Sequence, residues 1–471
     1  MRKFEKFIFE SYSFDDVSLK ASFFYSFDNW NEIFEEIIDF SSDDFSACKI
    51  NLWNKIILNN FLFNLHIALW ISYYKLFPTK ILEVKSGFLD DDQITFWKKF
   101  YKNWLWEFFI KNDINFSELI NFTNAWSIWI LEELTIKNNY IESSANFVES
   151  KDLLLWWGGK DSIVSYSLLS SSPSIEKRGA RGELWWKKFD LFVFWKNDSI
   201  KENTAKISEK EILLVKRQLS KNLFKLNEEG YYNGHVPITW IIAFVTFVVS
   251  YLYWYSNIIL SNEKSASENN TIWKWLKINH QYSKSLEFEM DLNKYLHNYI
   301  SKWINYFSLL RWMYEYKIAS IFSEQNKFFK DFSSCNRNFV ITKEKQKKLW
   351  CCECEKCSFV FLILSPFLEE KELINIFWEN LFEKISLEKT FRELIWLENY
   401  KPFECVWTYD ESLLSAKKVI KNRNISWIIL DNLKEEILEK CDDETEKKLE
   451  EKLLKIEWGN SIPESFSKLL K

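Results

Sequence analysis

The sequence is short of glycine and of histidine, and it has no net positive charge. It has 471 residues with only 8 glycines, where ordinary usage would give about 33. Its 4 histidines leave few side chains that change charge near neutral pH. The formal net charge of −5 provides no general attraction for nucleic acid or for acidic membranes. Local lysine and arginine side chains must therefore hold any anionic substrate.

The pattern of a signal peptide is also missing. Charged residues occur at once in the segment 1–6, and no uninterrupted apolar stretch follows. Of the 8 cysteines, four lie within residues 351–357, which favours a thiol or metal cluster over a disulfide scaffold. We therefore expect a cytoplasmic protein of about two to four domains.

Tryptophan is as abundant as glycine is rare. There are 25 tryptophans, so that tryptophan and glycine together number 33, close to the glycine content expected of a chain this long. Several tryptophans occupy positions where a turn or a helix cap favours glycine, as in residues 103–106, 253–256 and 394–397. We hypothesise that UGA codons of the gene specify glycine and are read here as tryptophan. The alternative is a truly tryptophan-rich protein, although tryptophan suits turns poorly.

The stretch 153–162 has the pattern of a strand, a tight turn and a helix start. An apolar run at 153–156 is followed by two glycines, and a Lys-Asp-Ser sequence then opens the segment 163–169. Paired glycines allow the backbone to approach an anion with its N–H groups pointing inward. The N-terminus of the following helix favours the same negative charge. An ordinary strand–turn–helix corner is the alternative.

This turn resembles the signature loop of the PP-loop ATP pyrophosphatases, Ser-Gly-Gly-x-Asp-Ser, which split ATP into AMP and pyrophosphate. Lys160 can neutralise phosphate, Asp161 can hold Mg²⁺ and the Ser162 hydroxyl can donate a hydrogen bond. The chain departs from the pattern at Trp157, whose indole would fill the space that a phosphate needs. The candidate ATP-binding residues are Trp157, Gly158, Gly159, Lys160, Asp161 and Ser162.

The order of apolar segments predicts an α/β fold in four parts. Residues 1–145 read as an N-terminal α/β domain, 146–330 as the ATP-binding core, 331–410 as a region with a cysteine cluster, and 411–471 as a charged, solvated helical tail. In the core, strands alternate with helices, which predicts a parallel, Rossmann-type (HUP-like) sheet with ligands at the carboxyl ends of its strands. The expected strands are 153–156, 190–194, 212–215 and 257–260, with a helix at 163–169.

An apolar stretch at 236–256 has the length of a membrane span. Polar residues and a proline interrupt it, and no basic flank marks a cytoplasmic side. We expect a buried helix without stable membrane insertion.

Polar runs follow the expected strand 257–260 and flank the apolar stretch. Residues 261–269 and 279–289 are dense in hydroxyls, amides and charges, and 233–237 forms a polar turn. A strand end would project such side chains into a site, but a solvated loop has a similar composition. His235 and His280 lie in these runs and are better functional candidates than His66 or His297.

The cysteine run has metal-ligand spacing. Cys351, Cys354 and Cys357 form C-x₂-C-x₂-C, and Cys335 upstream can complete a tetrahedral thiolate set for Zn²⁺. The same order resembles the zinc site of the 7-cyano-7-deazaguanine synthases. Free buried thiols and an iron–sulfur cluster are the alternatives.

Together these runs resemble the UDP-N-acetylmuramoyl-L-alanyl-L-glutamate epimerase family of peptidoglycan precursor synthesis. The resemblance extends from about residue 70 to 410, with tryptophan at several positions where the family pattern has glycine. It is carried by the segments 71–75, 103–108, 158–162, 233–237, 261–268, 279–285, 306–311, 332–337, 351–357 and 401–405.

The resemblance implies an ATP-dependent epimerase that inverts the terminal L-Glu of its UDP-linked dipeptide to D-Glu and releases AMP and pyrophosphate. The implied cofactors are ATP, Mg²⁺ at Asp161 and a structural Zn²⁺. Candidates for proton transfer are His280, His235, Glu268, Glu263 and Cys335. Candidates for substrate binding are Asn262, Lys264, Ser265, Ser267, Tyr282, Lys284, Arg311, Asn336 and Arg337.

Two other classes remain open at this point. Another PP-loop ligase, amidotransferase or tRNA-modifying enzyme would use adenylate chemistry on a different substrate, although a net charge of −5 offers no basic stripe for RNA. A degenerate PP-loop protein, with ATP blocked by Trp157, would be a binding module. The sequence does not fix the oligomeric state.

Overall fold

The computed structural model describes most of the chain. The described residues are 4–28, 32–42, 50–52, 54–115, 119–125, 151–171, 177–178, 184–185, 189–234, 236, 238–267, 271–273, 276–278, 282–339, 348–398, 408–422, 426–457, 459 and 461–470.

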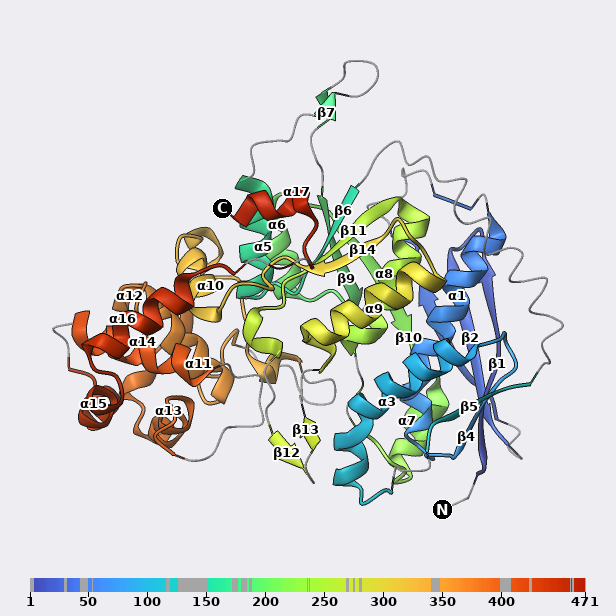
Figure 1. The fold of residues 1–471 in the computed structure, drawn as a ribbon, viewed down its shortest axis with the longest axis horizontal. Coiled ribbons are helices and arrows are strands. Elements are labelled where there is room, and N and C mark those ends of the chain that lie inside the picture. Colours follow the sequence, from blue (N-terminus) through green and yellow to red (C-terminus); the bar gives the residue numbers. More distant parts are fainter. Residues whose placement is uncertain are drawn as a thin grey trace.

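A ten-stranded sheet crosses the molecule (Figure 1), in the order β14-β11-β6-β9-β10-β3-β2-β1-β4-β5. Five strands, β14 to β10 in that order, are parallel, β10 pairs antiparallel with β3, and β1, β4 and β5 are again parallel. The strands are β1 (Lys6–Asp15), β2 (Lys20–Phe27), β3 (Phe34–Asp39), β4 (Ile81–Val84), β5 (Asn121–Asn124), β6 (Lys151–Leu155), β9 (Phe189–Trp195), β10 (Ile212–Gln218), β11 (Tyr255–Leu260) and β14 (Asn305–Ser308).

The parallel strands are buried on both faces, which explains why they appear in the sequence as continuous apolar runs. In β6, Leu153 and Leu155 belong to one hydrophobic core, and Leu154 belongs to a second core on the opposite face. β11 alternates in the same way, with Ile258 in the first core and Ile259 in the second. The sheet therefore separates the two cores.

Helices cover the two faces in the manner of a doubly wound fold. α5 (Lys160–Ser171) and α6 (Ser199–Ser208) contribute to the second core, whereas α8 (Ile238–Tyr253) and α9 (Leu286–Tyr299) contribute to the first. From β6 the chain winds outward to β9 and β10, then returns to the other side of β6 with β11 and β14. The direction of winding changes between β6 and β11, and such a switch point is where open α/β sheets bind ligands.

The N-terminal segment adds the second half of the sheet. α1 (Lys55–Leu69), α2 (Ile71–Tyr74) and α3 (Asp91–Lys111) pack on its first-core face, and α7 (Lys221–Glu228) follows β10. Strands from 1–145 and from 146–330 thus form one continuous sheet. By length and composition the helical stretch Lys55–Tyr74 could cross a membrane, but 78% of its apolar window is buried inside the protein, which is typical of a core helix.

Most of the C-terminal part is helical and gathers at the end of the molecule away from β1 and β5, whereas the last short helix lies near α5 (Figure 1). Each of these helices packs one apolar face into the second core. The described part of 411–471 is therefore helical, as expected, but it is packed against the protein and is not a solvated tail. The helices are α10 (Glu315–Phe322), α11 (Glu355–Leu364), α12 (Glu370–Phe377), α13 (Glu388–Leu394), α14 (Tyr409–Asn422), α15 (Ile428–Lys440), α16 (Asp443–Leu454) and α17 (Glu464–Ser467).

The α/β fold predicted from the sequence is confirmed. Each of the four expected core strands is present, as β6, β9, β10 and β11, and the expected helix after the glycine turn is α5. The apolar stretch at 236–256 is the buried helix α8 followed by the start of β11. The prediction of a turn or a helix cap at 103–106 was wrong, because these residues lie inside α3.

Candidate active site at the switch point

The glycine turn joins the carboxyl end of β6 to the N-terminus of α5. Gly158 has φ +69°, and an added Cβ would lie 2.9 Å from side-chain atoms of both Ile200 and Thr204. Only glycine fits there without strain. The Ser162 hydroxyl donates to the Gly159 carbonyl at 2.9 Å, which closes the turn onto the helix. The backbone therefore takes the strand–turn–helix form that suits a bound phosphate.

The two tryptophans before the glycines occupy the space beside this turn. Trp156 is buried, and its indole N–H donates to the Lys201 carbonyl at 3.3 Å and to the Thr204 hydroxyl at 3.2 Å. Trp157 is 39% exposed, with the Lys201 ammonium 5.6 Å from the centre of its ring. A small cavity beside them is lined by Leu155, Trp156, Trp157, Phe192, Phe194, Lys201 and Ile242. Glycine at 156 and 157 would enlarge this cavity next to the phosphate loop.

Lys160 lies in a cluster of carboxylates. Its ammonium hydrogen-bonds to Asp161 and to Glu315, the first residue of α10. Glu263 follows β11, and one carboxylate oxygen from each of Asp161, Glu263 and Glu315 lies within 4.8 Å of the others. The cluster thus brings together the neighbouring strands β6 and β11 and the helix α10.

Burial and neighbouring charges shift the pKa values of Glu315 and Lys160. Burial, and then the negative charge of Asp161, raises the pKa of Glu315 to about 8. Burial lowers the pKa of Lys160, but the charges of Asp161 and Glu315 outweigh burial and raise it above its ordinary value. Lys160 therefore stays protonated and balances only part of the negative charge around it.

Glu411 of α14 contacts the cluster through the backbone of Glu315. One of its carboxylate oxygens accepts the Glu315 backbone N–H at 2.6 Å, and the other accepts the Thr408 hydroxyl at 2.8 Å. Burial raises the pKa of Glu411 to about 7. Glu411 therefore fixes the start of α10, and with it the position of Glu315.

The polar run after β11 lies beside the same edge of the sheet. The Asn262 amide donates to the Ser308 hydroxyl at 3.0 Å, and the Ser267 hydroxyl accepts the Leu286 N–H at 3.0 Å. Lys264 pairs with Glu457 and lies 4.5 Å from the centre of the Tyr314 ring. Ser265 is buried, and its hydroxyl has no hydrogen-bond partner among the residues described.

Arg311 is buried rather than open to solvent. Its guanidinium donates to Glu289 at 2.8 Å and to the Glu263 carbonyl at 3.2 Å. In this arrangement it holds the Glu263 backbone in place.

The other predicted substrate ligands lie in different surroundings. Tyr282 is buried, which raises its pKa to about 12. Lys284 and Asn336 are half-buried. Arg337 is 54% exposed and pairs with Glu353 at 2.6 Å.

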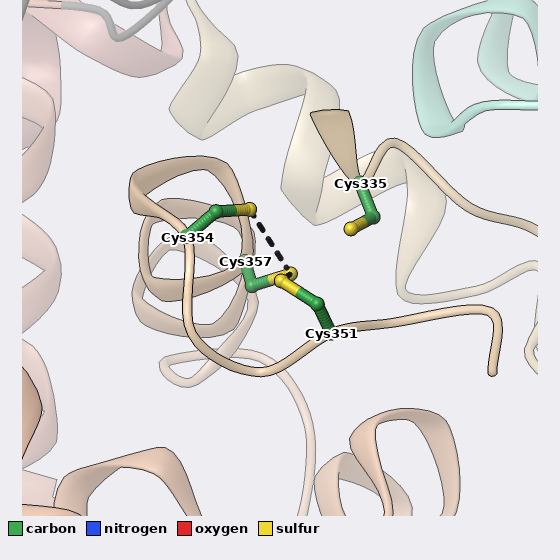
Figure 2. A group of neighbouring side chains, drawn as sticks. All are labelled: Cys335, Cys351, Cys354 and Cys357. Carbon is green, nitrogen blue, oxygen red and sulfur yellow. Dashed lines mark hydrogen bonds between the residues drawn. The ribbon is translucent and has the colours of Figure 1, made fainter. Parts of the chain in front are cut away.

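The four predicted thiol ligands lie together, and Figure 2 shows their side chains directed toward one another. One sulfur atom from each lies within 4.8 Å of the other three, and Cys357 Sγ is 3.6 Å from Cys351 Sγ and 3.5 Å from Cys354 Sγ. Sulfur atoms around a tetrahedral zinc are about 3.8 Å apart, given a Zn–S bond of about 2.3 Å. Hydrogen bonds from Cys354 and Cys357 lower the pKa of Cys335 to about 4. Among the described residues these cysteines are free thiols, and the donor set fits Zn²⁺.

The segment just before Cys335 contacts the glycine turn. The Ser333 N–H donates to the Gly158 carbonyl at 3.4 Å, and a Cβ on Gly159 would lie 3.0 Å from the Ser334 hydroxyl. Cys335 is the next residue of the same segment. The segment that carries the first thiol therefore covers the glycine turn.

Two family models match the chain, the MurL N-terminal domain over residues 1–309 and the MurL C-terminal domain over residues 331–451. This chain belongs to the MurL family. The first match ends with β14 and so spans the whole ten-stranded sheet, whereas the second spans the thiol cluster and most of the C-terminal helices.

Curated relatives of this MurL-family chain carry one name. The UDP-N-acetyl-alpha-D-muramoyl-L-alanyl-L-glutamate epimerase of Xanthomonas oryzae pv. oryzae is 30% identical over 360 residues, which cover 76% of this chain and 74% of that protein. Proteins of the same name from Micromonospora sp. and Salinispora tropica are 32% and 34% identical over 263 and 259 residues. Each of those two matches covers 55% of this chain, and 54% and 53% of the respective relative. No solved structure matches.

Three predicted residues of this MurL-family chain, His235, Glu268 and His280, lie outside the described residues. The other two histidines have internal partners. His66 is fully buried, with its Nδ1 3.0 Å from the Ser86 hydroxyl, and burial lowers its pKa to about 3. His297 Nε2 lies 2.9 Å from the Ile304 carbonyl oxygen.

Sequence reasoning missed Glu315, Glu411 and Lys75. Glu315 was detectable as a lone carboxylate in an otherwise apolar and aromatic stretch, whereas Glu411 looked like an ordinary charge at the start of a polar helix. Lys75 is buried and donates to the Gly234 carbonyl, beside His235. Burial, and then the nearby Arg217 charge, lowers the pKa of Lys75 to about 7.

Among the described residues, four tryptophans have the left-handed backbone that favours glycine. They are Trp195 (φ 75°), Trp254 (φ 66°), Trp378 (φ 69°) and Trp396 (φ 62°). Trp378 caps the C-terminus of α12, and Trp254 and Trp396 follow the ends of α8 and α13. Helices commonly end in this way with glycine, and a bulky residue there is strained. Four further tryptophans, Trp70, Trp240, Trp312 and Trp350, have buried indole nitrogens without a hydrogen-bond partner among the described residues.

Proposed function

We propose that this chain is an ATP-dependent epimerase that inverts the terminal L-Glu of UDP-N-acetylmuramoyl-L-alanyl-L-glutamate to D-Glu in peptidoglycan precursor synthesis. The observation that carries the proposal is a phosphate-type glycine turn at the switch point of a MurL-family sheet. The names of the curated relatives support the substrate and the reaction. The shared family supports a cytoplasmic enzyme with no nucleic-acid partner.

Adenylation explains why the reaction needs ATP. The α-proton beside a free carboxylate is hard to remove, because the carbanion would lie next to a negative charge. Transfer of AMP to that carboxylate gives an acyl-adenylate with a far more acidic α-carbon and releases pyrophosphate. Deprotonation on one face, reprotonation on the other and hydrolysis then give the D-Glu product and AMP.

The residues have separate tasks in this scheme. The turn of Gly158 and Gly159, with Lys160 and Ser162, binds the phosphates of ATP, and Asp161 holds the Mg²⁺ that offsets their charge. His280 is our first choice for the proton carrier and His235 our second, with Glu268 as a further candidate. Cys335 is assigned instead to the thiol cluster. Lys264, Lys284, Asn336 and Arg337 are proposed for the substrate carboxylates and the UDP diphosphate.

The thiol cluster is proposed as a structural zinc site. Zinc would hold Cys335, Cys351, Cys354 and Cys357 in a closed tetrahedral set and so fix the segment that covers the phosphate loop. A closed set leaves no coordination position for substrate. The zinc would therefore act on the fold and not on the reaction.

We further propose that the natural protein has glycine at residues 156 and 157. The strained tryptophans elsewhere in the chain support the recoding of UGA, and Trp157 stands where the loop pattern requires a small residue. Mass spectrometry of peptides from the native organism tests this proposal directly. A tryptophan mass at position 157 would refute it.

Exchange of labelled pyrophosphate into ATP tests the function. We expect exchange that depends on the UDP-linked L-Ala-L-Glu dipeptide and is greatest in the protein with glycine at 156 and 157. Exchange with a different carboxylic acid alone would indicate another adenylating enzyme, and no exchange at all would indicate a binding module.

A second assay separates proton transfer from adenylation. His280→Gln should keep pyrophosphate exchange and lose the wash-out of the substrate α-proton into D₂O. Loss of both activities would show that His280 serves binding.

A further inference from the structure

We propose that Asp161, Glu263 and Glu315 together form one binding site for a hard divalent cation of the Mg²⁺ or Mn²⁺ class. This inference deepens the proposed ATP-dependent function and rests on it for its purpose. It assigns Glu263 to cation binding instead of proton transfer, and it adds Glu315, which no sequence pattern singled out.

The geometry suits a small cation. The three carboxylates come from the start of α5, the segment after β11 and the start of α10, so three separate elements surround one point. One oxygen of each lies within 4.8 Å of the others. Oxygen ligands of Mg²⁺ lie about 2.0–2.1 Å from the metal, hence about 3–4 Å from one another. Small side-chain rotations would therefore bring the three groups into coordination distance.

A further positive group would be favourable here, because the acidic side chains of the cluster outnumber the Lys160 ammonium that contacts them. Three carboxylates share the Lys160 ammonium, which already contacts Asp161 and Glu315. Lys356 also acts electrostatically on Glu315. Glu315 is fully buried, and its Oε1 has no hydrogen-bond partner among the described residues, while its Oε2 accepts from Lys160. A buried carboxylate oxygen without a partner is costly, and a cation ligated there would remove that cost.

Surrounding residues hold the ligands in place. The Glu411 carboxylate fixes the backbone of Glu315 at the start of α10, and the Arg311 guanidinium holds the carbonyl of Glu263. These supports are themselves buried, so the carboxylates are positioned before a cation arrives. A salt bridge to Lys160 alone would need only Glu315 and would not explain why Glu263 faces the same point.

A cation bound at this site would prepare the glycine turn for the phosphates of ATP. A cation bound between β6 and β11 lies where phosphates on the Gly158 turn can complete its coordination. The Lys160 ammonium, displaced from the carboxylates, is then available to the same phosphates. Asp161 therefore contributes to a three-carboxylate cation site that Lys160 occupies in the absence of the metal.

Manganese binding without nucleotide tests the proposal separately from activity. Titration of the zinc-containing protein with Mn²⁺, followed by the paramagnetic resonance signal of free Mn²⁺, should show one bound ion per chain. Glu315→Gln and Glu263→Gln should each weaken Mn²⁺ binding at least tenfold. Glu446→Gln, the same change at a buried carboxylate of α16 that pairs with Lys418, should leave the affinity unchanged.

Each outcome decides the matter. Unchanged Mn²⁺ affinity in a folded Glu315→Gln or Glu263→Gln protein, or no binding by the unmodified chain, would overturn the site. If Glu315→Gln fails to fold, as judged by circular dichroism, Glu263→Gln alone decides, because Glu263 lies outside the α-helices. If Mn²⁺ binds through these residues but the unmodified protein shows no pyrophosphate exchange, the proposed function is refuted and the site stands. If the unmodified protein shows exchange but the Glu315→Gln and Glu263→Gln variants bind Mn²⁺ as it does, the site is refuted and the proposed function stands.

Discussion

The thiol cluster and the carboxylate cluster both adjoin the glycine turn but are built in different ways. Three of the four thiols fall within seven residues, at the end of one loop and the first turn of α11. The carboxylates come from positions 161, 263 and 315, which only the winding of the sheet brings together. The thiols form a closed set of four, whereas the carboxylates retain an unpaired oxygen.

This difference suggests that the thiol cluster stabilises the fold and that the carboxylate cluster takes part in the reaction. A closed thiolate set around zinc satisfies every ligand and contributes free energy to folding. The carboxylates instead leave negative charge that a bound cation would balance. We therefore expect damage to the first cluster to affect stability, and damage to the second to affect turnover.

The largest effect is expected from Cys357→Ser. Structural zinc binding is worth about 10–16 kcal/mol in small domains, so loss of a central thiolate should abolish zinc retention and lower the melting temperature sharply. Metal analysis and thermal melting measure both quantities. Cys352→Ser is the matched control, because Cys352 lies outside the set and its thiol contacts the Phe377 carbonyl. Equal zinc content in the two variants would contradict the assignment.

Asp161→Asn should affect activity and leave stability nearly unchanged. Pyrophosphate exchange should fall by about a hundredfold or more, the typical cost of losing one group that stabilises transition-state charge. The melting temperature should change little, because the Asp161 side chain is 30% exposed. A large loss of stability with exchange retained would show that the carboxylates, like the thiols, serve the fold.

Lys75 extends the comparison to a buried cation outside both clusters. Its pKa in the folded protein is about 7, against an ordinary value of 10.5. Its neutral form is therefore favoured by folding, and its contribution to stability is present above about pH 10.5 and is lost as the pH falls toward 7. Lys75→Met should be more stable than the unmodified chain at pH 7 by up to a few kcal/mol, with the gap closing at pH 10. Urea unfolding at the two pH values measures it, and a pH-independent gap would contradict the shifted pKa.

The smallest effect is expected at the strained tryptophans. Trp378 is 63% exposed at a left-handed helix end, so Trp378→Gly should stabilise the protein by about 1 kcal/mol. Trp427→Gly is the control, because Trp427 is buried with φ −124° and its removal should destabilise by about 3 kcal/mol or more. Chemical denaturation compares the two. Loss of stability in Trp378→Gly would weaken the case for recoded glycine.

Local patterns made part of the molecule predictable. The β6–turn–α5 unit and the thiol set depend on residues close in sequence, apart from Cys335, and the sequence predicted both arrangements. Glu315 lies 155 positions from Lys160, and its role depends on which strands are neighbours, which periodicity does not reveal. Trp104 and Trp106 were wrongly placed in a turn because tryptophan and aromatic neighbours obscured the helical spacing of α3. The packing of 411–471 was hidden in the same way by its many surface charges.

The antiparallel pairing of β10 with β3 has a consequence for any shortened form of the chain. β3 covers the outer edge of β10, where Arg217 aligns with Ile38 and forms a buried salt bridge with Glu36 at 2.7 Å. A fragment that begins after residue 150 would lack β3 and would expose the backbone groups of β10 at residues 216–218, and Arg217 would lose its partner Glu36. Such an edge is a template for self-association. The N-terminal strands therefore protect the edge of the parallel half of the sheet from self-association.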